Sequence, residues 1–165
     1  MRRTWSPKGK TPVLRAPFNW KRKSAIGALA LSPDRTQVRT FLSLHSGSIR
    51  APQIVAFLRS LRRHLRGRVL VVWDRLGTHL SRLVKAHLAE ERAWLEIELL
   101  PAYAPELNPV EYLWAYLKSG SLANFCADDL SQVTRQVKRR LRRVRRTDLA
   151  WSFLKHSGLY PSLLC

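Results

Sequence analysis

The feature that most constrains the fold is a short apolar segment in the middle of the chain. Residues 69–73 read Val-Leu-Val-Val-Trp, with no charged or hydroxyl side chain among them, and Asp74 follows directly. Antiparallel strands with one wet face alternate apolar and polar residues, whereas parallel strands covered on both faces are apolar throughout. The segment therefore predicts a parallel strand of an α/β sheet that is buried on both sides.

Helices and a second strand are predicted around this segment. In residues 51–66 apolar side chains recur at spacings of three and four while arginines take the other face, which is typical of an amphipathic helix. A further helix is expected over 81–92 with Ser81 as its cap. Residues 95–100 are predicted to form the next strand.

The remaining segments complete the order of elements. Residues 24–31 and 37–44 are predicted to pair as a hairpin across the turn at 32–35. A helix is expected to open at Asn108-Pro109, with Asn as cap and Pro in the first turn. A long helix over 128–146 and a short one through 151–154 follow. This order predicts an α/β fold in which helices flank a mixed sheet.

Charge separates the chain from most globular proteins of its size. Lys and Arg total 30 of 165 residues against 11 Asp and Glu, a net charge of +19, while 45% hydrophobic residues exclude a wholly disordered tail. A polyanion compensates such an excess of positive charge, so nucleic acid is the expected partner. Cys126 and Cys165 form no disulfide framework, and no apolar run is long enough for a membrane helix. A cytoplasmic, nucleoid-associated protein is expected.

Two basic segments are candidates for DNA contact. Residues 135–146 carry eight cations and no acid, and valines and leucines at helical spacing keep one apolar stripe on the same segment. The solvent-facing cations predicted to contact phosphates are Lys138, Arg139, Arg142, Arg143 and Arg146. The cluster Lys21, Arg22 and Lys23 is the second candidate, with a solvated arm as the alternative.

Asp74 and Glu111 are the candidate catalytic acids. Asp74 ends the apolar strand, at the edge where open α/β sheets bind ligands. Its alternative role is to cap backbone donors in the following loop. Glu111 stands three residues after Asn108, where a capping box would also place a Glu. A strand-end Asp and a helix-borne Glu in a basic protein nevertheless suit a two-metal phosphodiester site, which normally needs three or four acids.

Two sequence blocks carry a family resemblance. Residues 71–81 (VVWDRLGTHLS) and 99–114 (LLPAYAPELNPVEYLW) resemble the signature blocks of DDE transposases of the mariner superfamily, in its bacterial insertion-sequence branch. Residues 3–9 resemble the segment that follows the first catalytic strand, so the likeness covers residues 1–120. It implies an RNase H-like fold and DNA cleavage and strand transfer with Mg²⁺ or Mn²⁺. The implied partners are transposon ends, target DNA and a second copy of the chain.

The resemblance also assigns roles to residues. It implies that Asp74 is the second catalytic acid and Glu111 the third, both as metal ligands. Arg75 stands where the family usually has Asn. His79 and Asn108 are possible accessory residues; His79 would contact a metal-bound water or a phosphate, or else simply bond to backbone. Tyr103, between two prolines, is expected to shape its loop rather than touch substrate.

The first catalytic acid and its central strand are expected to be missing from this chain. By the resemblance they would precede residues 3–9, and none of the other acids is placed to substitute. Asp34 lies in the hairpin turn, and the remaining candidates lie on late helices or an exposed helix face: Asp128, Asp129, Asp148, Glu90 and Glu91. The expected organisation is an incomplete catalytic domain over residues 1–125 with basic helices packed on it over 126–165.

Two functions remain open at this stage. The first is a transposase catalytic-domain fragment that is inactive as an isolated chain. The second is a non-catalytic, basic DNA-binding remnant of a decayed insertion sequence. An RNA-binding, ribosome-associated protein also fits the charge, but it leaves the acidic motifs unexplained.

Overall fold

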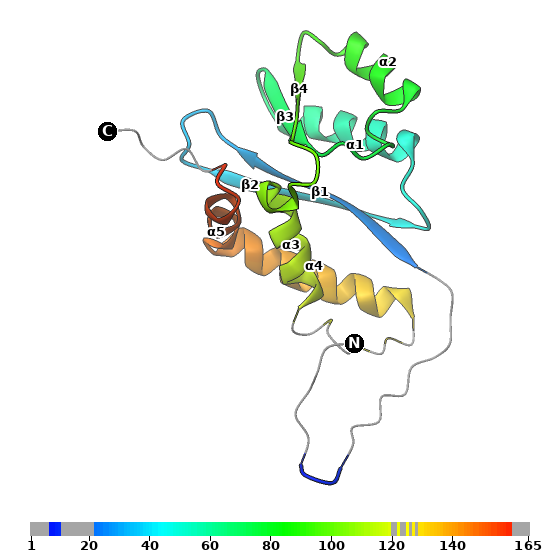
Figure 1. Ribbon diagram of the computed structural model, residues 1–165, viewed down its shortest axis with the longest axis vertical. Helices are drawn as coiled ribbons and strands as arrows, with labels where there is room; N and C mark the ends of the chain where they lie inside the picture. Colours follow the sequence, from blue (N-terminus) through cyan, green and yellow to red (C-terminus); the bar gives the residue numbers. More distant parts are fainter. Residues whose placement is uncertain are drawn as a thin grey trace.

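The structure is a computed structural model that describes residues 7–10, 22–119, 122, 125, 127 and 129–159 (Figure 1). The order of elements predicted from the sequence is confirmed. The elements are β1 (Lys23–Leu31), β2 (Val38–Ser46), α1 (Ala51–His64), β3 (Val69–Trp73), α2 (Arg82–Glu90), β4 (Leu95–Leu99), the 3-10 turn η1 (Pro105–Leu107), α3 (Pro109–Lys118), α4 (Leu130–Arg146) and α5 (Leu149–His156). Lys21, Cys126, Asp128 and Cys165 lie outside the described residues.

The mixed α/β architecture flanked by helices is also confirmed, with one difference in the sheet. β1 and β2 pair antiparallel from Lys23↔Ser46 to Leu31↔Val38, and β3 and β4 pair parallel from Val69↔Leu95 to Trp73↔Leu99. These pairs form two separate two-stranded sheets rather than one. A single mixed sheet would need a ladder between the two pairs, and no strand in the described ranges supplies it. Each strand therefore keeps one unpaired edge there.

Local signals in the sequence explain where the helices begin. Pro52 occupies the first turn of α1, and the Gln53 side chain accepts a hydrogen bond of 3.0 Å from the Arg50 N–H. The predicted cap of α2 is present, because the Ser81 hydroxyl oxygen accepts from the Val84 N–H at 3.5 Å. Both arrangements satisfy amide groups that a helix start otherwise leaves without partners.

The hairpin lies between two groups of helices (Figure 1), and each group packs on it around an apolar core. The first core lies between α1, α2 and the parallel strands, and side chains of β1 and β2 such as Ile26 and Phe41 pack against it. The second core holds α3, α4 and α5 against the other face of the hairpin, where Leu29 and Leu42 contribute. Because successive strand residues point to opposite faces, a single hairpin can serve both cores.

One close contact fixes α3 on the hairpin. Gly27 of β1 lies beneath the indole ring of Trp114, so close that a Cβ atom at this position would stand 2.9 Å from the ring. Glycine is therefore the residue that lets α3 approach β1 at this point. The helix that carries Glu111 depends on this approach for its position.

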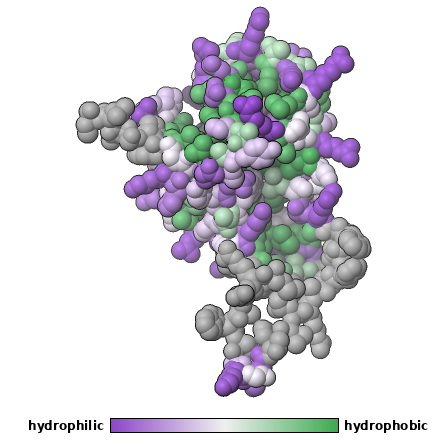
Figure 2. All heavy atoms as spheres, viewed as in Figure 1, coloured by the Kyte–Doolittle hydropathy of each residue, from purple (hydrophilic) through white to green (hydrophobic). Residues whose placement is uncertain are grey.

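The prediction that β3 is buried on both sides is wrong. Leu70 is 58% exposed and Val72 is 40% exposed, and the residues paired with them on β4, Glu96 and Glu98, are exposed as well. The reason is that α1 and α2 cover one face of the parallel pair, while α3, α4 and α5 cover the hairpin instead. In the space-filling view, apolar side chains are accordingly visible among polar ones on the surface (Figure 2). None of the helices in the described part of the chain combines the length and apolarity needed to cross a bilayer.

Candidate functional site

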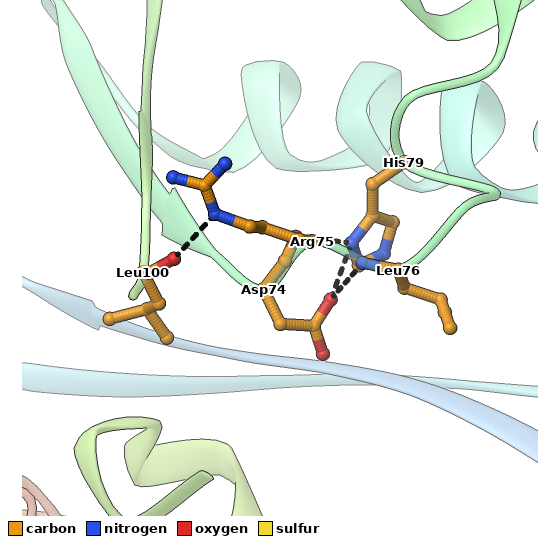
Figure 3. Close-up of polar contacts among 5 residues, drawn as sticks. All are labelled: Asp74, Arg75, Leu76, His79 and Leu100. Atoms are coloured by element: carbon orange, nitrogen blue, oxygen red, sulfur yellow. Dashed lines mark hydrogen bonds and ion pairs between the residues drawn. The ribbon is translucent and has the colours of Figure 1, made fainter. Parts of the chain in front are cut away.

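The carboxyl end of β3 positions the first candidate acid. Asp74 directly follows Trp73, the last residue of β3, and its side chain is 49% exposed. Its Oδ1 atom accepts a hydrogen bond from the Leu76 N–H at 3.1 Å and lies 2.9 Å from Nδ1 of His79 (Figure 3). The local capping considered from the sequence is therefore present, but it uses one carboxylate oxygen only. No hydrogen bond within the described residues engages Oδ2, which leaves this atom for a ligand.

His79 holds the Asp74 carboxylate from the following loop. Its ring stacks on the Trp73 indole, with centroids 4.5 Å apart and planes 7° apart. The Nδ1 atom lies 2.9 Å from Oδ1 of Asp74 and 3.3 Å from its backbone oxygen. Since both neighbours are acceptors, Nδ1 carries the proton in this arrangement. The structure thus places His79 against the carboxylate, where it orients Asp74.

The start of α3 positions the second candidate acid. The Asn108 side chain caps the helix, because its Oδ1 accepts from the Val110 N–H at 3.1 Å. A capping box would have Glu111 bind the Asn108 N–H, but that N–H already donates to the Pro105 carbonyl at 3.0 Å. The Glu111 side chain is exposed and forms no hydrogen bond within the described residues. Its carboxylate is therefore available to a ligand.

Both acids face the same pocket. It has a volume of about 400 Å³, within the range of ligand pockets. The lining residues are Asp74, Arg75, Leu100, Pro101, Ala102, Tyr103, Ala104, Pro105, Asn108 and Glu111. The structure thus brings together Asp74, Asn108 and Glu111, while His79 supports Asp74 without lining the pocket.

Two residues of the pocket were not predicted as site residues. Arg75 departs from the family motif and lines the pocket, where its Nε donates a hydrogen bond of 3.2 Å to the carbonyl of Leu100, another lining residue. Its guanidinium extends away from the Asp74 carboxylate (Figure 3). Tyr103 was assigned to loop shaping, yet its side chain stands free in solvent. The sequence signals that could have predicted them are a basic residue directly after Asp74 and an aromatic residue between two prolines before Glu111.

The donor set suits a hard divalent cation but is incomplete. Mg²⁺ prefers carboxylate oxygens, and one or two carboxylates are its usual protein ligands. Asp74 and Glu111 fit that chemistry. Within the described ranges, however, no group of three or more His, Cys, Asp or Glu side chains is close enough to hold a metal ion.

Three other acids form interactions away from the pocket. Asp34 accepts hydrogen bonds in the hairpin turn, as predicted, and the Ser32 hydroxyl on its carboxylate lowers its pKa. Asp129 caps α4 through the amides of the first turn, and its hydrogen bond with the Ser131 side chain lowers its pKa. Glu91 pairs with Arg62. None of these carboxylates belongs to the pocket lining.

The basic helix α4 exposes the five cations that the sequence singled out. At 100° per residue they fall within an arc of about 140°, opposite the buried valines and leucine. Their side chains are all exposed: Lys138, Arg139, Arg142, Arg143 and Arg146. Two further arginines bind the protein instead, since Arg140 donates to the Tyr116 carbonyl at 2.6 Å and Arg145 to the Thr40 carbonyl at 2.9 Å. The outward face of α4 is therefore a continuous positive stripe.

The amino-terminal basic cluster is described only in part. Arg22 and Lys23 are at the open end of the hairpin, where they donate to the hydroxyls of Ser48 and Ser46 respectively. Lys21 lies outside the described residues. The prediction of a second DNA contact at this cluster remains untested.

The structure thus combines an α/β fold, a strand-end Asp and a helix-borne Glu at one pocket, and a positive face on α4. Residues 1–134 match the family model described as DDE superfamily endonuclease, and the chain belongs to that family. The resemblance seen in the two motif blocks is thereby confirmed at the level of the family.

Solved structures give a more distant likeness. A chain of the structure entitled "Crystal structure of the Mos1 Strand Transfer Complex" is 20% identical, with a TM-score of 0.48. The alignment covers 98% of this chain and 51% of that one, so the chain spans about half the length of this relative. Among curated proteins, none matches.

Proposed function

We propose that this chain is part of the catalytic domain of a mariner-type transposase of the bacterial insertion-sequence branch. It acts on DNA in the nucleoid of the cell. The reaction is cleavage of transposon-end DNA and its transfer to a target, with Mg²⁺ or Mn²⁺. The observation that carries this proposal is the shared pocket of Asp74 and Glu111, which come from the end of β3 and the first turn of α3. Family membership supports the same reaction class.

In this proposal the residues of the site have separate roles. Oδ2 of Asp74 and the Glu111 carboxylate hold the metal, while His79 and the Leu76 N–H keep the Asp74 carboxylate in one orientation. These two carboxylates would hold a metal ion that supplies Lewis-acid polarisation to the phosphodiester. The exposed cations of α4 bind phosphates and position the duplex without reading its sequence.

We also propose that a strand outside residues 1–165 supplies a third carboxylate. The support is twofold: no other described acid lies in the pocket lining, and the hairpin and the parallel pair form two sheets without a strand between them. An added central strand ending in Asp would join the sheets into one RNase H-like sheet. In this proposal residues 1–125 belong to the catalytic domain, and residues 126–165 form basic helices packed on it.

Plasmid nicking tests the proposal. The isolated chain, incubated with supercoiled plasmid and Mg²⁺ or Mn²⁺, is expected to leave the plasmid intact. A fusion that adds an Asp-ended β-strand before residue 1 is expected to nick it. Asp74→Asn and Glu111→Gln should each abolish that nicking. Glu106→Gln is the matched control, because Glu106 is an exposed acid of η1 that does not line the pocket.

Two results would contradict the proposal. Nicking by the isolated chain that Asp74→Asn abolishes would show that two acids suffice or that the third is within the chain. Nicking by the fusion that survives both Asp74→Asn and Glu111→Gln would remove these acids from the reaction.

A second candidate function is non-catalytic DNA binding by a remnant of a decayed element. The positive stripe of α4 favours it, because that stripe needs no acid to work. If each of its five cations contacts a phosphate, log K against log salt concentration should have a slope of about −4.5. This candidate predicts the same slope in Glu111→Gln and no nicking by any fusion, which separates it from the transposase proposal.

A further inference from the structure

Tyr103 is an unusual feature of the pocket. Its side chain is 102% exposed, which means that no neighbouring group covers the ring at all. An aromatic ring is among the largest apolar groups that folding can bury, so a ring held wholly in water contributes nothing to the core. The ring is therefore not held in place by packing against its own loop.

The backbone at Tyr103 is also unusual. Its φ angle is +59°, a left-handed conformation that is uncommon for any residue other than glycine and that is found at strained functional sites. Leu100, three residues before Tyr103, anchors the start of the loop, because its N–H donates to the Trp73 carbonyl at 2.9 Å and its carbonyl accepts from Arg75. Pro101 and Pro105 further restrict the segment. The ring is thus presented on a stiff support.

The pocket combines three kinds of chemistry, of which this ring is one. Asp74 and Glu111 offer carboxylates for a cation that bridges to phosphate, Arg75 offers a guanidinium, and Tyr103 offers a bare aromatic face. A metal-bound nucleotide presents the matching features, namely a phosphate with its bridging cation and a heterocyclic base. An aromatic face accepts any base, because every base has a π surface.

We propose that Tyr103 is a stacking platform for one unpaired base at the DNA end held in the pocket. Bases inside a duplex already stack on each other, so a base can reach this ring only when its nucleotide is splayed out or lies in a single-stranded end. The preferred substrate is accordingly a DNA end with an unpaired terminal nucleotide, rather than an intact duplex. This inference rests on the proposed function, since it needs DNA at the acidic pocket.

Fluorescence of 2-aminopurine tests the inference directly. The probe is a DNA hairpin with a single unpaired 3′ nucleotide that is 2-aminopurine, and Ca²⁺ replaces Mg²⁺ so that binding is measured without cleavage. A blunt hairpin of the same duplex, labelled with a dye at its loop, reports duplex binding by anisotropy. Wild-type protein is expected to quench the 2-aminopurine on binding and to prefer the overhanging hairpin about tenfold.

Four variants isolate the ring. Tyr103→Ala and Tyr103→Gly both remove it, and glycine additionally relieves the positive φ, so agreement between the two excludes an effect of the backbone. Both should lose the quenching and the tenfold preference while blunt-duplex binding stays unchanged. Tyr103→Phe should retain both properties. Leu83→Ala, an exposed apolar residue of α2 outside the pocket lining, is the matched control and should behave as wild type.

The outcomes separate this inference from the proposed function. Equal binding of both hairpins by wild type, or a preference that survives Tyr103→Ala, overturns the stacking role and leaves DNA binding intact. Absence of binding to either hairpin overturns the inference and DNA recognition together. Loss of quenching in Tyr103→Phe as well would assign the effect to the hydroxyl and not to the ring face.

Discussion

The contact between Gly27 and Trp114 allows a sharp test of how the fold holds Glu111 in place. In Gly27→Ala the new methyl carbon would stand 2.9 Å from one indole carbon and 3.1 Å from another. That is about half an ångström inside ordinary van der Waals contact, so α3 or the ring must move. Overpacking of this kind costs about 1–3 kcal/mol. Replacing glycine in a strand returns about 0.5–1 kcal/mol through backbone entropy.

Taking the middle of each range, the expected net loss in the free energy of unfolding is about 1 kcal/mol. Urea unfolding followed by circular dichroism measures it, as a lower midpoint with an unchanged slope. Gly77→Ala is the matched control, because a Cβ at Gly77 meets nothing within 4 Å and its φ is not positive. Pairing Gly27→Ala with Trp114→Phe should recover part of the loss, since the smaller ring leaves room. A Gly27→Ala protein as stable as wild type would refute the account of how α3 is positioned.

Four further predictions concern side chains around the two cores and the site. His79→Ala should weaken Mn²⁺ binding about tenfold, because a lost partner of a metal-ligating group commonly has this effect; titration calorimetry measures it. Arg145→Ala should lower the free energy of unfolding by about 1–2 kcal/mol through its lost hydrogen bonds to the β2 carbonyl. Arg142→Ala should leave stability unchanged but reduce the salt slope of DNA binding by about one. Asp129→Ala should lower thermal stability at pH 7 but not below the lowered pKa of Asp129. The folded-state pKa of this carboxyl is depressed by the Ser131 hydroxyl, so its contribution is present above the unfolded-state pKa and disappears as pH falls. Melting curves of both proteins, recorded from pH 7 downwards, check whether their difference in melting temperature disappears.

The elements were predictable because their signals are local. The spacing of leucines in α1, the hydroxyl at Ser81 and the Asn108-Pro109 pair each act within one or two helical turns. The two acids of the pocket were predictable for a related reason, since the end of a parallel strand and the start of a helix are places where the chain itself presents side chains to a sheet edge.

The predictions that were wrong concern which elements of the fold pack against each other. An apolar strand such as β3 indicates that its faces are suited to burial, but whether a helix covers Leu70 and Val72 depends on distant segments. The separation of the sheet into two pairs has the same origin, because ladder partners are not encoded in the strand's own pattern.

Glu111 does not cap α3, because another acceptor takes the Asn108 N–H. The sequence allowed it to cap α3, and the Pro105 carbonyl takes the amide that it would have bound. Similarly, the two prolines around Tyr103 predicted a stiff loop but not that the ring would point into solvent. Such outcomes depend on the three-dimensional course of the loop and not on residue type.

The central claim is that Asp74 and Glu111 bind one and the same divalent cation. Mn²⁺ titration followed by electron paramagnetic resonance, on wild type, Asp74→Asn, Glu111→Gln and the double variant, tests it most directly. If the two carboxylates share an ion, each single substitution should remove most of the binding, the double variant should lose no more, and Glu106→Gln should bind as wild type. Losses that add independently in the double variant, or binding that survives both substitutions, would contradict the account.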